Sequence, residues 1–182
     1  MNICLFGAAS DDIAKEYKDA AFELGTLIAA GGHTLIFGGG NTGVMGATAR
    51  GAKSKSGIVI GVAPYFFNRD GVLYDDCDEL IITETMHERK SLLIDRSDAF
   101  VVLPGGIGTY DEFFEVIVLR QLGRHSKPVA VLNTKGYYTL MHSLLEKTID
   151  EGFMTPECRS IYSFFDTPAP IIEFFERELG KK

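Results

Sequence analysis

The sequence predicts an α/β fold in which helices cover both faces of a doubly wound parallel sheet of six to seven strands. Two observations predict it. Short, continuous apolar runs alternate with amphipathic segments along the whole chain, and several of the apolar runs end in glycine. Strands that are apolar throughout are buried on both faces, which is typical of parallel sheets whose strands are connected by helices.

The first strand and helix show how the pattern is recognised. Residues 2–7 form an apolar run that a glycine ends, and in residues 12–30 the apolar positions recur at helical spacing. These positions are Ile13, Tyr17, Ala20, Ala21, Leu24 and Leu27. Gly31 and Gly32 then mark the end of the helix, because glycine is favoured just past a helix C-terminus.

The same alternation continues along the rest of the chain. Further strands are expected at 33–40, 57–63, 79–84, 99–106, 127–133 and 161–166, the last of them short. Further helices are expected at 43–56, 86–96, 108–122, 137–151 and 168–179. No repeat, low-complexity tract or linker interrupts them. We therefore expect one Rossmann-like nucleotide-binding domain over residues 1–182, a length sufficient for one buried core.

The composition excludes several classes of function. Eighteen basic and 25 acidic residues give a net charge of −7, which argues against general binding to duplex nucleic acid. No apolar run is long enough to cross a membrane, and the N-terminus lacks the basic start of a signal peptide. Three cysteines without CxxC spacing and four scattered histidines indicate a reduced, cytoplasmic protein that holds no metal ion and no cofactor.

Three glycine-rich turns are expected at the carboxyl ends of strands, where doubly wound sheets bind ligands. They lie at 7–10, 38–46 and 104–109. Neither of the two longer turns is a Walker A loop or the GxGxxG turn of a dinucleotide site. What remains is a phosphate site of mononucleotide size, in which Gly105, Gly106 and Gly108 admit the ligand and Thr109 offers a hydroxyl. The alternative is a tight strand-to-helix turn that needs glycine only for its geometry.

Two acidic residues, Asp111 and Glu112, follow the last glycine turn. The apolar residues expected to face the sheet are Tyr110, Phe113, Phe114, Ile117 and Val118. Glu112 then points away from the sheet, with Glu115 one turn further on. A nearby positive helix end favours the ionised carboxylate, so Glu112 suits a base or a cation-stabilising group. The alternative is an acid that only complements the helix dipole.

The helix at 108–122 is apolar on more than one side. Val116 and Leu119 are expected on the side of Glu112, away from the face that covers the sheet. A helix that is apolar nearly all round is buried nearly all round. We therefore expect a homodimer whose interface lies beside the site.

Arg89 and Lys90 stand at the start of the helix at 86–96. Two cations do not complement a helix N-terminus, and arginine is suited to bidentate phosphate contacts, which favours a binding role. The alternative is a solvated charge pair, and His87 is expected to pack or to form hydrogen bonds rather than to act in catalysis. The loop at 64–78 is long for a compact domain, which indicates either a functional flap or a plain surface excursion.

Three motifs together, GGGNTGVMG at 38–46, MHERK at 86–90 and PGGIGTYDE at 104–112, resemble those of the Lonely Guy family, the cytokinin riboside 5′-monophosphate phosphoribohydrolases. Members of this family are often labelled lysine decarboxylases. The resemblance covers nearly the whole chain. It implies a dimeric hydrolase that cleaves the N-glycosidic bond of a purine nucleoside 5′-monophosphate, of cytokinin type or AMP, to the free base and ribose 5-phosphate.

The resemblance also implies roles for individual residues. The catalytic arginine and glutamate of the family match Arg89 and Glu112. Contacts with the substrate or its phosphate are implied for Gly39, Gly40, Thr42, Gly43, Met86, Lys90, Gly105, Gly106, Ile107, Gly108, Thr109 and Glu115. The chain departs from the family pattern at Leu119 and Arg120 and in the loop at 64–78, so the preferred base stays open.

Two other functions share parts of this pattern. Lysine decarboxylation normally uses pyridoxal phosphate held on a lysine Schiff base, and the carboxylate and the short chain fit the nucleotide reaction better. A non-catalytic carrier of a nucleotide or of the molybdenum cofactor would have the same fold. A carrier needs no carboxylate facing the sugar carbon, so Arg89 together with Glu112 favours the enzyme.

Overall fold

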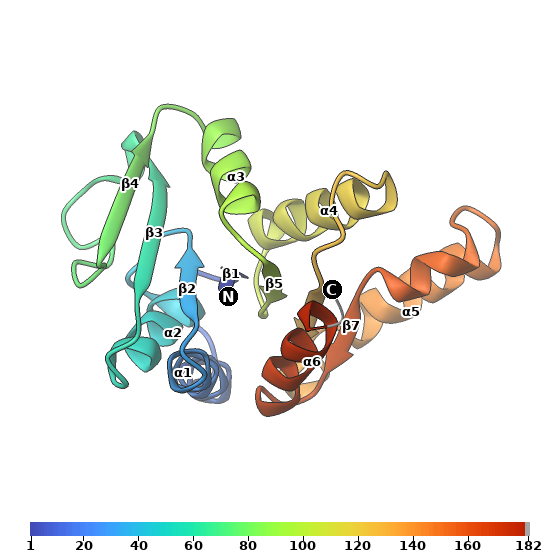
Figure 1. Cartoon of the computed structure of the whole chain (residues 1–182), viewed down its shortest axis with the longest axis horizontal. Coiled ribbons are helices and arrows are strands. Elements are labelled where there is room, and N and C mark those ends of the chain that lie inside the picture. Colours follow the sequence, from blue (N-terminus) through green and yellow to red (C-terminus); the bar gives the residue numbers. More distant parts are fainter. Residues whose placement is uncertain (181–182) are drawn as a thin grey trace.

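The computed structural model describes residues 1–180 and contains a seven-stranded parallel sheet with helices on both faces (Figure 1). The strands are β1 (Asn2–Phe6), β2 (Thr34–Phe37), β3 (Val59–Pro64), β4 (Glu79–Thr83), β5 (Ala99–Val102), β6 (Val129–Leu132) and β7 (Ser163–Phe165). The α-helices are α1 (Lys15–Ala30), α2 (Gly43–Lys53), α3 (Met86–Asp95), α4 (Ile107–Gln121), α5 (Thr139–Asp150) and α6 (Ala169–Leu179). Short 3₁₀ turns are η1 (Tyr65–Phe67), η2 (Thr134–Gly136) and η3 (Pro156–Ser160). The predicted fold class is confirmed.

Several elements are shorter than predicted, mostly where glycines begin. β2 ends at Phe37, directly before the glycines at 38–40, and β5 ends at Val102, before Leu103, Pro104 and the glycines that follow them. Helix α1 begins at Lys15, a few residues later than expected. The loop at 64–78 is not wholly irregular, since η1 opens it and Leu73 forms an isolated antiparallel bridge with Gly40.

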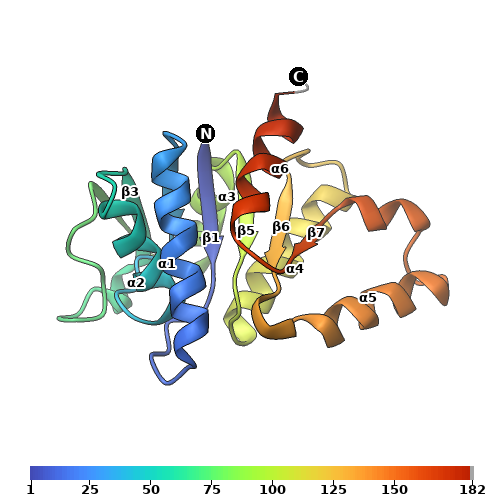
Figure 2. The ribbon, with the colours of Figure 1, turned by 90° about the horizontal axis from the view of Figure 1, so that it is seen from below.

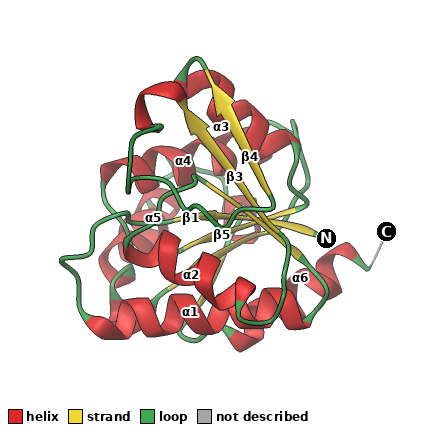
Figure 3. Ribbon diagram, turned by 90° about the vertical axis from the view of Figure 1, so that its left-hand side faces the viewer, coloured by secondary structure: helices red, strands yellow, loops and turns green. Residues whose placement is uncertain are grey.

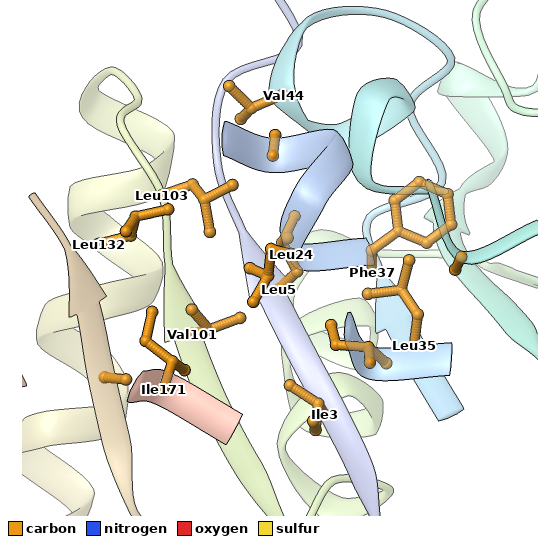
Figure 4. Close-up of a cluster of buried hydrophobic side chains, with 14 of the residues drawn as sticks. Ile3, Leu5, Leu24, Leu35, Phe37, Val44, Val101, Leu103, Leu132 and Ile171 are labelled. Atoms are coloured by element: carbon orange, nitrogen blue, oxygen red, sulfur yellow. The ribbon is translucent and has the colours of Figure 1, made fainter. Parts of the chain in front are cut away.

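The alternation of side chains along each strand divides the core into two layers. In β1, Ile3 and Leu5 pack toward α1, α2 and α6, whereas Cys4 and Phe6 pack toward α3, α4 and α5. Helices α1 and α6 lie in front of the strands in Figure 2. Figure 3 shows α1 and α2 on one side of the sheet and α3 and α4 on the other. The first layer joins strand and helix side chains such as Leu5, Leu24 and Val101 in one cluster (Figure 4).

Helices α1 and α2 approach closely because glycine stands at both points of contact. A Cβ added to Gly25 would lie 2.1 Å from the carbonyl oxygen of Thr48, and one added to Gly51 would lie 2.1 Å from that of Phe22. The backbones therefore touch where any other side chain would hold them apart. This contact fixes α2 over β2 and β3, and so fixes its first turn at the edge of the site.

The buried side of α4 differs from the expected one. Phe113 and Ile117 face the core as expected, but Phe114 and Val118 are 39% and 46% exposed. Val116, expected on an outer face, is buried in the core of the chain itself. The buried residues of the helix are Thr109, Glu112, Phe113, Val116 and Ile117, which follow helical spacing. Two of these five residues, Thr109 and Glu112, are polar. The expected buried side was wrong because it was derived from the apolar residues alone.

The order of the strands places a crevice in the middle of the sheet. The order is β4-β3-β2-β1-β5-β6-β7, so the chain builds outward from β1 to β4 and then returns to β5 on the other side of β1. The loops after β1 and β5 lead to helices on opposite faces, and such a switch point is where doubly wound sheets bind ligands. The two loops are joined by a hydrogen bond from the Ala8 amide to the Pro104 carbonyl, 3.2 Å long. Within residues 1–180, no helix has the length and apolar character needed to cross a membrane.

Candidate active site

A cavity of about 370 Å³ lies at this switch point. The loop after β1, the start of α2, the loop after β3, helix α3 and the start of α4 form its walls. The lining residues are Gly7, Ala8, Ala9, Ser10, Met45, Phe67, Met86, Arg89, Gly106, Gly108, Thr109, Asp111 and Glu112. Sites for small molecules typically measure about 300–1,000 Å³, so the cavity is large enough for one.

Arg89 and Glu112 form a buried ion pair in the wall of the cavity. Their side chains are 8% and 10% exposed, and the Arg89 Nη1 donates to Glu112 Oε1 at 2.7 Å. The Arg89 Nε also donates to the carbonyl of Val62, at 3.2 Å. A Cβ on Gly38 would lie 2.1 Å from the Arg89 Nη2, so the guanidinium takes the space that a side chain at 38 would need. The arginine is therefore held from three sides.

Local sequence explains why Arg89 stands where it does. Thr85 caps α3 by accepting a hydrogen bond from the Glu88 amide, and the Glu88 carboxylate accepts one from the Thr85 amide in return. This capping box fixes the start of the helix. Arg89 then lies at the end of the first turn, on the buried side with Leu93.

Burial raises the pKa of the Glu112 carboxyl, while the charge and hydrogen bond of Arg89 oppose that shift. From the sequence, the positive helix end was expected to favour the ionised form of Glu112. That expectation was wrong in direction, because Glu112 lies in the second turn of α4 and is almost completely removed from water. The structure therefore contains a carboxylate that is a stronger base than an exposed glutamate.

The start of α4 offers unoccupied space to a ligand. The helix begins after Gly106, no side chain caps it and its first turn contains no acid. A Cβ on Gly106 or Gly108 would meet no atom within 4 Å, and neither residue has a positive φ. Neither packing nor backbone conformation therefore requires glycine at these positions. Free amides at a helix N-terminus beside an open cavity form a suitable site for an anion.

The glycine turn at 38–46 is organised differently. The amide of Gly43 donates to Asp11 Oδ1 at 3.0 Å, and the amides of Val44 and Met45 donate to the Ala8 carbonyl. The start of α2 is thus already occupied by groups of the protein. Gly43 has a φ of +63°, and its added Cβ would lie 2.4 Å from the Ala8 carbonyl oxygen, so the fold itself requires this glycine.

The remaining candidates of this turn lie outside the main cavity. Gly40 and Thr42 line a neighbouring cavity of about 260 Å³. It shares Ala9, Met45, Phe67 and Arg89 with the main cavity. The Thr42 hydroxyl donates to the Ala9 carbonyl. Gly39 has a positive φ and packs against the loop at 64–78 through Leu73.

Four candidates near α4, Lys90, Gly105, Ile107 and Glu115, also lie outside the main cavity. Lys90 binds Asp111 at 3.0 Å and Glu115 at 2.8 Å, and these partners raise its pKa. These ion pairs of Lys90 therefore stabilise the position of Asp111 in the wall of the main cavity. Ile107 is 86% exposed. Gly105 needs to be glycine for packing, since an added Cβ would lie 2.1 Å from Thr109 Oγ1.

The structure brings part of the predicted set together and adds residues that the sequence analysis did not select. The predicted residues around the cavity are Met86, Arg89, Gly106, Gly108, Thr109 and Glu112. The additional ones are Gly7, Ala8, Ala9, Ser10, Met45, Phe67 and Asp111. The glycine turn at 7–10 was a signal for the first four, and the unusual length of the loop at 64–78 was one for Phe67.

Comparison with known proteins shows which family this chain resembles. A family model described as "Possible lysine decarboxylase" matches residues 45–175. A cytokinin riboside 5′-monophosphate phosphoribohydrolase of Arabidopsis thaliana is 40% identical over 159 residues, which cover 87% of this chain and 75% of the relative. One of Mycobacterium tuberculosis is 40% identical over 154 residues, covering 85% of this chain and 82% of that relative. The chain belongs to the cytokinin riboside 5′-monophosphate phosphoribohydrolase family.

The phosphoribohydrolase family is thus the one that the three sequence motifs indicated. A solved structure adds a second similarity. The molybdenum-cofactor carrier protein of Chlamydomonas reinhardtii is 27% identical, with a TM-score of 0.72, over 100% of this chain and 98% of that one. The fold is therefore shared by a phosphoribohydrolase family and by a protein described as a carrier.

Proposed function

We propose that this chain hydrolyses the N-glycosidic bond of a purine nucleoside 5′-monophosphate, releasing the free base and ribose 5-phosphate. The observation that carries the proposal is the presence of two features in one cavity. One is the uncapped, glycine-lined start of α4, and the other is the buried Arg89–Glu112 pair. The names of the relatives agree with this reaction.

The 5′-phosphate is proposed to bind at the start of α4. Gly106 and Gly108 lack the side chains that would keep an anion away from the amides, and Thr109 lines the same cavity. The helix dipole adds favourable interaction with negative charge. A phosphate held here would fix the ribose, so that binding energy remote from the reaction positions C1′.

Glu112 is proposed to act at the sugar carbon. Loss of the base gives C1′ the character of an oxocarbenium ion. A carboxylate about 4 Å away stabilises such a cation by about 4 kcal/mol at an effective dielectric constant near 20, which corresponds to about a thousandfold in rate. Glu112 would also accept a proton from the attacking water. The water oxygen bonds to C1′, the electron pair of the C1′–N9 bond leaves with the base, and the base takes up a proton.

Arg89 is proposed to keep Glu112 ionised and correctly oriented. Its charge lowers the pKa of a carboxyl that burial raises, and its hydrogen bond fixes one carboxylate oxygen. The other oxygen stays available to water or to the developing cation. Since Arg89 also lines the cavity, it is placed to contact the substrate directly.

Lysine decarboxylation is not supported by the placement of Lys90. A Schiff-base lysine needs a lowered pKa and access to the ligand. Lys90 is paired with Asp111 and Glu115, which raise its pKa, and within residues 1–180 no lysine lines the main cavity. The description of the family model therefore does not fit the chemistry of this site.

The proposal includes a cytoplasmic homodimer. The outer side of α4, with the residue that follows it, carries four exposed apolar side chains in one stripe: Ile107, Phe114, Val118 and Leu122. An apolar stripe of this kind marks an interaction surface more often than it stays in water. Because the stripe begins at the phosphate end of α4, a second copy seated on it would lie beside the site.

Replacement of Glu112 tests the reaction against the carrier alternative. Glu112→Gln keeps the shape of the side chain, and we expect it to retain nucleotide binding while turnover falls by about a hundredfold or more. Turnover is measured by chromatography of the free base after incubation with AMP and with isopentenyladenosine monophosphate. Glu23→Gln, an exposed change on α1, is the matched control. Intact nucleotides with the unaltered, folded chain would favour the carrier, and normal turnover by Glu112→Gln would refute the role given to Glu112.

A further inference from the structure

Three successive carbonyl groups of the loop after β5 are held by hydrogen bonds from outside the loop. The Leu103 carbonyl accepts from the Tyr138 hydroxyl at 2.7 Å, and the Gly105 carbonyl accepts from the Tyr137 hydroxyl at 2.8 Å. Between them, the Pro104 carbonyl accepts from the Ala8 amide at 3.2 Å. Each of these peptide groups is therefore fixed in orientation.

Because the peptide group is planar, the hydrogen bond from Tyr137 to the Gly105 carbonyl also determines where the Gly106 N–H points. A trans peptide is planar, so the carbonyl of one residue and the N–H of the next point in opposite directions. The described residues contain no cis peptide bond. Tyr137 draws the Gly105 carbonyl to one side of the loop and thereby turns the Gly106 N–H to the other side.

The two sides of the loop face different spaces. Tyr137 lies with Tyr17 around a small cavity of about 180 Å³ behind the loop. Gly106 lines that small cavity and also the main cavity, where the start of α4 is open. An amide turned away from Tyr137 is therefore directed toward the main cavity.

The Tyr137 hydroxyl is itself held as a donor. It lies 3.3 Å from the Tyr110 hydroxyl, and because its single hydrogen goes to the Gly105 carbonyl, Tyr110 is the donor between the two. The neighbouring Tyr110 phenol and burial raise the pKa of Tyr137 to about 12, so the Tyr137 phenol stays protonated at neutral pH. Its ring packs edge-on against Tyr17 and Tyr138, with centroid distances of 5.9 and 4.9 Å.

We propose that Tyr137 is a positioning residue that directs the Gly106 amide at the phosphate of the substrate. The inference rests on the proposed function only in requiring a phosphate-bearing ligand at the start of α4. Tyr137 touches neither the ligand nor the reacting atoms, and it acts through one peptide group.

The neighbouring tyrosine provides a matched control. Tyr138 makes the same kind of hydrogen bond two peptide groups earlier, to the Leu103 carbonyl, but the residue after Leu103 is Pro104, whose nitrogen carries no hydrogen. Loss of the Tyr138 hydroxyl therefore removes its hydrogen bonds with the Leu103 carbonyl and the Gly105 amide, while the Gly105 carbonyl, which orients the Gly106 amide, keeps its hydrogen bond from Tyr137. Tyr17→Phe is a second control, because its ring contacts Tyr137 on the side away from the main cavity.

The experiment measures the affinity for ribose 5-phosphate by calorimetry in the full chain and in Tyr137→Phe, Tyr138→Phe and Tyr17→Phe, with thermal unfolding alongside. A hydrogen bond to a charged group contributes about 1.5–3 kcal/mol, so we expect Tyr137→Phe to bind about tenfold or more weakly. Tyr138→Phe should unfold at a lower temperature and bind with unchanged affinity. With AMP as substrate, Tyr137→Phe should raise KM more than it lowers kcat.

Equal affinity in Tyr137→Phe and the unaltered chain would overturn the inference, as would an equal loss in Tyr138→Phe. A chain that binds no ribose 5-phosphate would overturn it as well. If no nucleotide is hydrolysed but Tyr137→Phe still weakens ribose 5-phosphate binding, the proposed function fails and the inference stands. If hydrolysis is observed and the affinities do not differ, the inference alone fails.

Discussion

At the scale of single residues, the glycines of this chain divide into those that the fold requires and those that only a ligand explains. Gly43 and Gly105 are required, since an added Cβ would lie within 2.4 Å and 2.1 Å of other atoms of the protein. Gly106 and Gly108 have open space around them. From the sequence the four were indistinguishable, because a glycine letter carries no information about its neighbours in space.

Gly108→Ala tests this distinction. Alanine is favoured over glycine in a helix by about 0.5–1 kcal/mol, so the variant should be as stable as the parent chain or slightly more stable. A methyl group that crowds a tight contact costs about 1–3 kcal/mol, which corresponds to an affinity for ribose 5-phosphate lower by about tenfold. Calorimetry and urea unfolding measure the two effects. An unchanged affinity for ribose 5-phosphate would show that the phosphate does not bind beside Gly108.

The raised pKa of Glu112 predicts the acid side of the pH profile. The ionised carboxylate is the active form, so kcat/KM should fall as the pH drops through a pKa above the ordinary value of 4.5. The negative charge of Asp111 raises that pKa further, so Asp111→Asn should shift the acid limb to lower pH. The profile is measured with AMP across the acid range. A limb that moves upward in Asp111→Asn would contradict the assignment to Glu112.

At the scale of elements, every predicted strand and helix is present, because continuous apolar runs and helical spacing are local signals. Their ends and faces were less predictable. α4 shows why: Thr109 and Glu112 belong to its buried side, and polar residues are buried only when tertiary partners such as Arg89 compensate them. The ion pair itself joins α3 to α4, and nothing local in either helix could reveal it.

The contact between α1 and α2 predicts a large effect of a small change. In Gly25→Ala the new methyl group would overlap the Thr48 carbonyl, so the helices must separate. We expect a loss of about 1–3 kcal/mol in the free energy of unfolding, measured with urea. Gly108→Ala is the matched control, because the same substitution in the open start of α4 should not destabilise the chain. Equal stability of the two variants would show that α1 and α2 adjust without cost.

At the scale of the whole molecule, the sequence predicted the fold class, a doubly wound parallel sheet, but not the order of its strands. Parallel strands and helical connections followed from the sequence, whereas the return from β4 to β5 beside β1 depends on packing between distant segments. That return creates the crevice, which is why loop 7–10 and Met45 became site residues only in the structure. Within residues 1–180, the structure contains no group of three or more His, Cys, Asp or Glu side chains that could hold a metal ion.

The proposed dimer is tested at the outer side of α4. Phe114→Asp places a charge in the exposed apolar stripe, where water surrounds it in a monomer and a partner would bury it. We expect the variant to elute and scatter light as a monomer while remaining folded. Lys147→Asp, a charge change on α5, serves as the control. A parent chain that is already monomeric would refute the dimer.

The loop at 64–78 has a consequence for how relatives of this chain can diverge. It joins two strands at the edge of the sheet and reaches the main cavity through Phe67, while Gly71, Val72 and Leu73 line only the neighbouring cavity. The groups around the start of α4 and the Arg89–Glu112 pair belong to other segments. Insertions and replacements in this loop can therefore change the wall of the main cavity at Phe67 while the start of α4 and the Arg89–Glu112 pair stay intact. Relatives that differ in this loop are therefore expected to differ in the shape of the cavity rather than in the groups proposed to act on the phosphate and the sugar carbon.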